Sequence, residues 1–79
     1  MLIYMYYLII NKKTQEYYIN KSKNPQKSID AHIRRANNPN SKRYNTPLHV
    51  ALRNSFDDFI FYSLEHIPEW VEKYKQYIT

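Results

Sequence analysis

The chain has 79 residues, with 12 lysine and arginine residues against 7 aspartate and glutamate residues, and it contains no cysteine and no glycine. A stretch of this length forms one domain with a small core, so we expect a single domain over residues 1–79. Without cysteine, neither a disulfide nor a thiolate metal site can supplement that core.

The first predicted elements form a hairpin. Ile3–Ile10 is apolar on both alternating faces, which is typical of a central strand covered on both sides. Asn11–Thr14 is typical of a hairpin connection, and Glu16–Asn20 of its partner strand. This arrangement would bring Tyr7 and Tyr18 near each other.

A helix is predicted to begin at Asn24-Pro25, because the asparagine side chain can cap the helix and proline fits the first helical position. It is expected to end at residues 37–40, where three asparagines surround a proline. Its core stripe has the spacing i, i+4 and i+7 and consists of Ile29, Ile33 and Ala36. A neighbouring stripe with the same spacing carries a hydroxyl, an imidazole and a guanidinium, on Ser28, His32 and Arg35.

A basic loop at Ser41–Tyr44 precedes a second, shorter helix, which Thr46-Pro47 opens. Phe59–Glu65 is rich in aromatic and β-branched residues and predicts a third strand. After Pro68, a helical spacing of apolar residues predicts a final amphipathic helix, with Trp70, Val71, Tyr74 and Ile78 on its apolar face. The fold class is therefore α/β of the α+β type, with a three-stranded antiparallel sheet flanked by about three helices.

Charge is unevenly distributed along the chain. Residues 1–54 carry ten lysine and arginine residues and two acidic residues, a net of +8, whereas residues 55–79 carry two lysines and five acidic residues, a net of −3. The basic part predicts a polyanionic partner, nucleic acid first. A solvated basic face without such a partner is the alternative interpretation.

Two tyrosine-containing segments carry a resemblance to a known family. Met5-Tyr6-Tyr7 and Tyr18-Ile19-Asn20 stand ten residues apart, and this layout resembles the GIY-YIG nuclease family, in which one strand carries Gly-Ile-Tyr and the next carries Tyr-Ile-Gly. Met5 and Asn20 occupy the two glycine positions. His32 matches the histidine of the family's first helix, and Ser28 stands where the family usually has an arginine. The resemblance implies a GIY-YIG-like fold over nearly the whole chain.

The resemblance also implies a set of site residues. In the family, a tyrosine or a nearby base activates water, a glutamate holds one divalent metal, and an arginine lies near the scissile phosphate. Tyr7, Tyr18 and His32 are the retained catalytic candidates, and Glu72, before Tyr77-Ile78, resembles the metal-binding glutamate. An active enzyme would use Mg²⁺ or Mn²⁺, and no other cofactor is implied. The alternative interpretations are that the tyrosines pack in the core, that His32 is structural and that Glu72 is solvated.

Loss of the arginine at Ser28 predicts weak or absent cleavage, because serine cannot offer a fixed cationic fork to a phosphate. We therefore expect a domain that binds nucleic acid or another phosphate-bearing ligand. The candidate phosphate-binding residues are Lys21, Lys23, Lys27, Arg34, Arg35, Lys42 and Arg43.

Two rival functions stay open. The first is an active metal-dependent endonuclease in which Arg35 substitutes for the missing arginine, although the helical rise places it roughly 10 Å from Ser28 along the axis. The second is a small viral or mobile-element inhibitor or protein-interaction module that uses the same scaffold to bind a protein partner. The apolar run Met1–Ile10 is too short to span a bilayer and lacks signal-peptide features, so we expect an intracellular, cytoplasmic protein without membrane contact. The small core is compatible with a homodimer.

Overall fold

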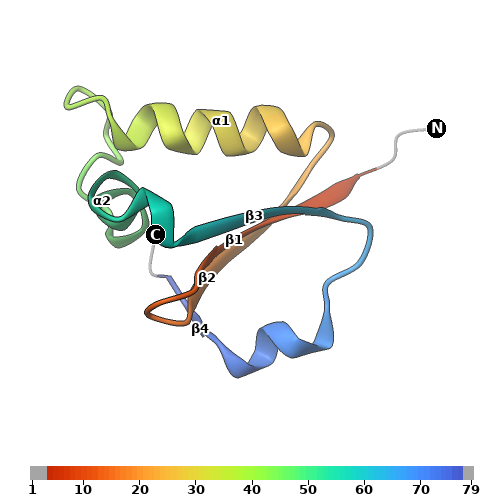
Figure 1. Cartoon of the computed structure of the whole chain (residues 1–79). Helices are drawn as coiled ribbons and strands as arrows, with labels where there is room; N and C mark the ends of the chain where they lie inside the picture. Colours follow the sequence, from red (N-terminus) through yellow and green to blue (C-terminus); the bar gives the residue numbers. More distant parts are fainter. Residues whose placement is uncertain (1–3, 78–79) are drawn as a thin grey trace.

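The computed structural model describes residues 4–77, which form an α+β fold built on a four-stranded mixed sheet (Figure 1). The strand order is β3-β1-β2-β4, with β1 antiparallel to both β2 and β3, and β4 parallel to β2. The strands are β1 Met5–Asn11, β2 Glu16–Ser22, β3 Phe59–Leu64 and β4 Lys75–Gln76. The helices are α1 Pro25–Ala36, α2 Pro47–Asn54 and two short 3₁₀ helices, η1 Phe56–Asp58 and η2 Glu69–Lys73.

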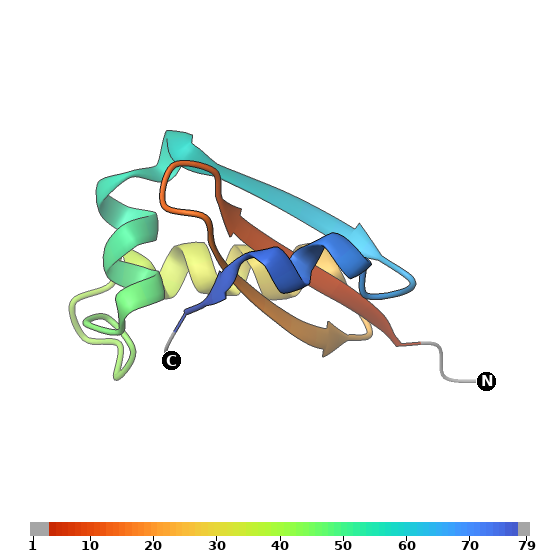
Figure 2. The ribbon, with the colours of Figure 1, turned by 90° about the horizontal axis from the view of Figure 1, so that it is seen from below.

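Strand β1 is central and is covered on both faces, as its sequence predicts. Tyr7 and Ile9 pack in the cluster that includes buried residues of α1 and α2. Leu8 and Ile10 face the other way and pack with Val71 of η2. Figure 2 shows the same layering from below, with η2 in blue in front of the strands and α1 in yellow behind them. The sheet therefore separates an α1 face from an η2 face.

Helix α1 begins where the sequence predicts. Pro25 is its first residue, and the Asn24 side chain accepts a hydrogen bond from the backbone N–H of Lys27 at 3.2 Å. Ile29 and Ala36 are buried against the sheet, so the predicted apolar stripe faces the core. The same orientation places His32 over the strands.

The prediction of three antiparallel strands and about three helices is wrong in two respects. A fourth strand, β4, lies parallel to β2, and the two α-helices are α1 and α2 among the residues that the structure describes. The segment expected to form the last helix makes only the short 3₁₀ helix η2 before it extends into β4. Ile78, which completes the predicted apolar face, lies outside the described residues.

The free edge of β2 explains this difference. The backbone N–H groups of Lys75 and Tyr77 donate to the carbonyl oxygens of Gln15 and Tyr17, at 3.0 and 2.7 Å. The Tyr77 ring is buried in the α1-face cluster, and its hydroxyl accepts a hydrogen bond from the Asn11 side chain at 3.0 Å. Strand pairing thus satisfies edge groups and buries a large ring, whereas a 3₁₀ run seldom continues beyond a few residues.

Over residues 4–77, no helix combines the length and the apolar character needed to cross a membrane.

Candidate functional site

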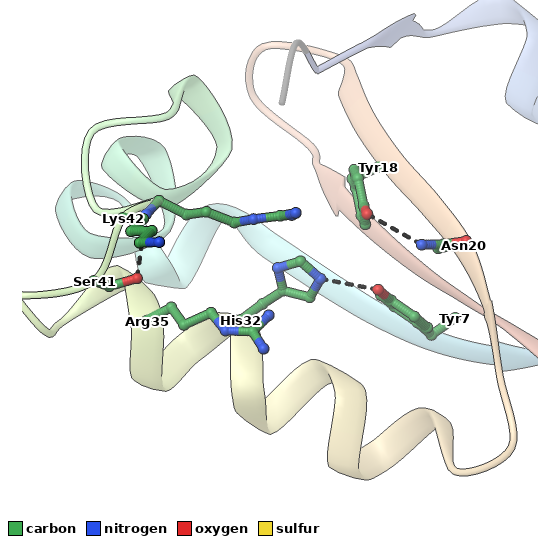
Figure 3. A pocket seen from close by; sticks show the side chains of 8 residues that line it. Tyr7, Tyr18, Asn20, His32, Arg35, Ser41 and Lys42 are labelled. Carbon is green, nitrogen blue, oxygen red and sulfur yellow. Dashed lines mark hydrogen bonds between the residues drawn. The ribbon is translucent and has the colours of Figure 1, made fainter.

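A pocket of about 380 Å³ opens between the β1–β2 hairpin, helix α1 and the loop that joins α1 to α2 (Figure 3). We call it the tyrosine pocket. Its lining residues are Tyr7, Tyr18, Asn20, His32, Arg35, Ser41, Lys42 and Arg43.

The strand register brings the two tyrosines together. Tyr7 of β1 is paired with Asn20 of β2, and Tyr18 lies two residues before Asn20 and hence on the same face of the sheet. The Tyr7 and Tyr18 ring centroids are 6.1 Å apart, and the His32 ring lies 5.6 and 5.0 Å from them. The prediction that the hairpin brings Tyr7 and Tyr18 near each other is confirmed, and His32 lines the same pocket.

A chain of hydrogen bonds runs inward from Tyr7. The Tyr7 hydroxyl lies 2.9 Å from Nε2 of His32, and Nδ1 of His32 lies 2.9 Å from Nε2 of His49 on α2. Nδ1 of His49 lies 2.7 Å from the backbone carbonyl oxygen of Arg43. All three side chains are buried, with 5%, 3% and 1% of their surfaces exposed for Tyr7, His32 and His49.

Burial keeps the three hydrogen-bonded side chains, Tyr7, His32 and His49, uncharged at neutral pH. The pKa of His32 is lowered to about 4, mainly because burial disfavours the charged ring and further because His49, Arg35 and Arg43 lie nearby. Burial also lowers the pKa of His49. The pKa of Tyr7 is raised, again chiefly by burial and next by Tyr18, so its hydroxyl keeps its hydrogen.

Tyr18 makes a different contact. Its hydroxyl oxygen accepts a hydrogen bond from the side-chain amide of Asn20 at 3.3 Å, as drawn in Figure 3. The Asn20 carbonyl oxygen accepts a hydrogen bond in turn from the backbone N–H of Lys21 at 2.9 Å. Asn20, at the position of the second family glycine, therefore lines the pocket with a side chain held by hydrogen bonds at both ends.

Three cationic side chains complete the tyrosine pocket. Arg35 follows His32 by three residues on α1 and thus projects from the same side of the helix. Lys42 and Arg43 come from the α1–α2 loop, and all three side chains are exposed. No carboxylate is among the residues that line this pocket.

Arg53 holds the loop that carries Lys42 and Arg43. Its guanidinium donates to the carbonyl oxygens of Ala36 and Tyr44, both at 2.8 Å, and lies 3.7 Å from the centroid of the Tyr44 ring. The two carbonyl groups belong to the end of α1 and to the loop itself. Arg53 therefore ties the loop to both helices.

A second, larger pocket of about 730 Å³ lies along α1, from the residues that precede the helix to its last turn. We call it the adjoining pocket, because Arg35 lines both. Besides Arg35, three of the predicted phosphate-binding residues line it, namely Lys23, Lys27 and Arg34, and so does the acidic Asp30. Ser28 also lies here, with its hydroxyl 2.6 Å from that of Ser22, and does not line the tyrosine pocket. Lys21 is exposed on β2 and lines neither pocket.

The structure does not bring Glu72 to the catalytic candidates. Glu72 is exposed on η2, on the opposite side of the sheet from α1, where it lines a shallow pocket with Trp70 and Lys73. Mg²⁺ and Mn²⁺ are bound in proteins mainly by carboxylate and other oxygen ligands. The tyrosine pocket has no carboxylate, and no group of three histidine or acidic side chains within residues 4–77 could hold a metal ion, so its residues do not fit the implied metal.

His49 and Arg53 are the supporting residues that sequence reasoning missed. His49 is spaced at i and i+3 with the buried Leu52, which indicated an inward-facing position on α2. Nothing in the sequence indicated the two carbonyl partners of Arg53, because they lie 9 and 17 residues away along the chain.

A scan against protein-family models and searches of curated proteins and of solved structures each found no match to this chain.

Proposed function

We propose that this domain binds a phosphate-bearing ligand, nucleic acid first, in the tyrosine pocket, on a scaffold that resembles the GIY-YIG nucleases. The observation that carries the proposal is the convergence of Arg35, Lys42 and Arg43 on two tyrosine hydroxyls in one open pocket. Phosphate oxygens accept strong, charge-assisted hydrogen bonds from guanidinium and ammonium groups. No carboxylate lines the pocket to oppose a phosphate.

The adjoining pocket favours a polymer over a single phosphate. Lys23, Lys27 and Arg34 follow α1 away from the tyrosine pocket, and Arg35 lies at the junction of the two. A nucleic-acid backbone carries one phosphate per nucleotide, so these cations offer contacts to several phosphates in succession. One carboxylate, that of Asp30, lies among them in the adjoining pocket. The first two thirds of the chain therefore supply the proposed binding surface.

We further propose that cleavage is weak or absent. Ser28 is hydrogen-bonded to Ser22 beside the adjoining pocket, and Glu72 lies across the sheet from the tyrosines. The tyrosine pocket thus has cations for a phosphate, but the carboxylate that would hold a metal in an active enzyme is not among its lining residues.

An active endonuclease is the second candidate, and one contact favours it. The Tyr7 hydroxyl lies 2.9 Å from Nε2 of His32, within hydrogen-bond distance, although the lowered pKa of His32 and the raised pKa of Tyr7 both oppose transfer of the proton. This pair has the geometry of a general-base arrangement.

The binding experiment compares two variants with the same change in charge. Arg35→Glu with Lys42→Glu alters the tyrosine pocket, whereas Lys12→Glu with Lys13→Glu alters exposed residues of the β1–β2 turn. Titration of a labelled single-stranded oligonucleotide at low salt should show at least about tenfold weaker binding for the pocket variant than for the turn variant. Equal losses would indicate a solvated basic face, and no binding by the native chain would favour a protein partner.

Cleavage is read from the same samples after Mg²⁺ or Mn²⁺ is added. We expect little or no cutting by the native chain, because no carboxylate lines the tyrosine pocket to hold the metal ion. Rapid metal-dependent cutting by the native chain that Tyr7→Phe abolishes would establish the endonuclease instead.

A further inference from the structure

One end of the Tyr7–His32–His49 chain has a fixed hydrogen-bonding role. The carbonyl oxygen of Arg43 can only accept, and it lies 2.7 Å from Nδ1 of His49. The Thr46 hydroxyl lies 3.1 Å from the same nitrogen, but it donates its own hydrogen to the Arg43 carbonyl at 3.0 Å. Nδ1 of His49 must therefore carry a hydrogen.

The hydrogen on Nδ1 of His49 determines the direction of each hydrogen bond as far as Tyr7. A neutral His49 with a hydrogen on Nδ1 has a lone pair on Nε2, so Nδ1 of His32, 2.9 Å away, must donate. A neutral His32 then has its lone pair on Nε2, and the Tyr7 hydroxyl at 2.9 Å donates to it. The Tyr7 hydrogen points inward, and its oxygen lone pairs remain for the tyrosine pocket.

We propose that His49 is a positioning residue that, acting through His32, fixes Tyr7 as a hydrogen-bond acceptor toward the pocket and leaves Tyr18 as the donor. The inference rests on the proposed binding of a phosphate-bearing ligand and extends it. The pocket then binds a phosphate group together with an oxygen that donates a hydrogen bond to the Tyr7 hydroxyl oxygen. That oxygen belongs either to a water molecule or to a ribose 2′-hydroxyl.

The two tyrosine hydroxyls have different hydrogen-bonding roles in the pocket because their partners differ. Tyr18 accepts a hydrogen bond from Asn20, and its hydroxyl hydrogen can be donated to a phosphate oxygen in the pocket. Phosphodiester oxygens only accept hydrogen bonds, so they cannot pair with the lone pairs that Tyr7 presents. A hydroxyl donor can pair with Tyr7, and Arg35 and Arg43 beside it hold the phosphate.

The direct test is to measure both histidine tautomers by long-range ¹H–¹⁵N NMR on the protein without ligand at pH 7. We expect His32 and His49 both to be neutral with the hydrogen on Nδ1. A hydrogen on Nε2 of either ring, or a charged His32, would overturn the inference. Because no ligand is present, this result does not depend on whether the domain binds phosphate.

Two variants test whether His49 sets the tautomer. His49→Gln offers a carboxamide oxygen that can accept from Nδ1 of His32, so His32 should keep its hydrogen there. His49→Leu removes the acceptor, and the hydrogen should move to Nε2 of His32. Retention of the Nδ1 hydrogen in the leucine variant would refute the positioning role. If that variant does not fold, the tautomers of the native protein still decide the inference.

A binding comparison identifies the source of the hydroxyl. Ribo- and deoxyribo-oligonucleotides of one sequence are titrated into the native protein and into Tyr7→Phe. With a ribose hydroxyl, the native protein should prefer RNA by roughly 3- to 10-fold, the effect of one hydrogen bond, and the variant should lose that preference. With water, the native protein should show no preference and Tyr7→Phe should weaken both alike.

Unchanged binding of both oligonucleotides by Tyr7→Phe would overturn the acceptor role of Tyr7. Binding of neither by the native protein, together with the expected tautomers, would refute the phosphate proposal while leaving the orientation of Tyr7 established.

Discussion

Nδ1 of His32 lies 2.9 Å from Nε2 of His49, and this contact joins α1 to α2 directly behind the tyrosine pocket. Two buried imidazoles can share one hydrogen bond only while at least one of them is neutral. With Arg35 and Arg43 nearby, burial lowers the pKa of both rings. The packing of the two helices is therefore coupled to the protonation of the candidate site.

The free energy of unfolding should fall as pH decreases from about 6.5 to about 4. In the unfolded chain, His32 takes up a proton near the ordinary histidine pKa of about 6.5. In the folded protein, burial lowers that pKa to about 4, so the unfolded state binds more protons within this window. The stabilisation is fully present above pH 6.5, and its loss amounts to about 3 kcal/mol for His32 by pH 4.

Urea unfolding at several pH values measures this loss. His32→Gln should flatten the dependence on pH between 4 and 6.5, whatever its effect on absolute stability. His66→Gln is the control, because His66 is exposed in the connection between β3 and η2. An unchanged slope in His32→Gln would show that another group controls the pH dependence.

Arg53→Gln should lower the free energy of unfolding by about 1–3 kcal/mol, because it leaves the carbonyl groups of Ala36 and Tyr44 without their charged donor. It should also weaken oligonucleotide binding, since the loop carrying Lys42 and Arg43 loses its attachment. Arg53→Lys keeps the charge but loses the planar stack on Tyr44, so it should recover only part of the stability.

Chemical unfolding and oligonucleotide titration of both variants provide the measurements. Arg34→Gln, on the exposed side of α1, is the stability control and should change the free energy by less than about 0.5 kcal/mol. Full stability of Arg53→Lys would mean that charge alone holds the loop.

Gln15 has a backbone φ of 60°, a conformation that glycine adopts without the steric cost of a Cβ atom. Gln15→Gly should therefore raise the free energy of unfolding by about 1 kcal/mol. Lys13→Gly, in the same turn, serves as the control. Among residues 4–77, only Gln15 has a positive φ, so glycine at position 13 relieves no strain and should lower stability. Thermal unfolding of both variants provides the measurement. A Gln15→Gly variant that is less stable than the native protein would contradict the prediction.

The elements with strong local signals were predictable from the sequence. The Asn24-Pro25 start fixes α1, and the two apolar faces of β1 indicate a strand with packing on each side. Together with the spacing of Tyr7 and Tyr18, these features were sufficient to gather the tyrosines and His32 at one pocket.

Contacts between distant segments were not predictable. The apolar spacing after Pro68 satisfied a helical period, but the open edge of β2 and the burial of Tyr77 determine the outcome there. The helical rise indicated only that Arg35 lies far from Ser28 along α1, and the position of the α1–α2 loop makes Arg35 a lining residue of the tyrosine pocket. His49 gains its importance only from the packing of α2 against α1.

The salt dependence of oligonucleotide binding tests the central claim most directly. Each phosphate contact that a cation makes to a single strand contributes about 0.7 to the slope of log K against log salt concentration. Arg35→Gln with Arg43→Gln should therefore reduce the slope by about 1.4, while Lys12→Gln with Lys13→Gln should leave it unchanged. Equal slopes for the native protein and the pocket variant, or binding that does not respond to salt, would contradict a phosphate site in the tyrosine pocket.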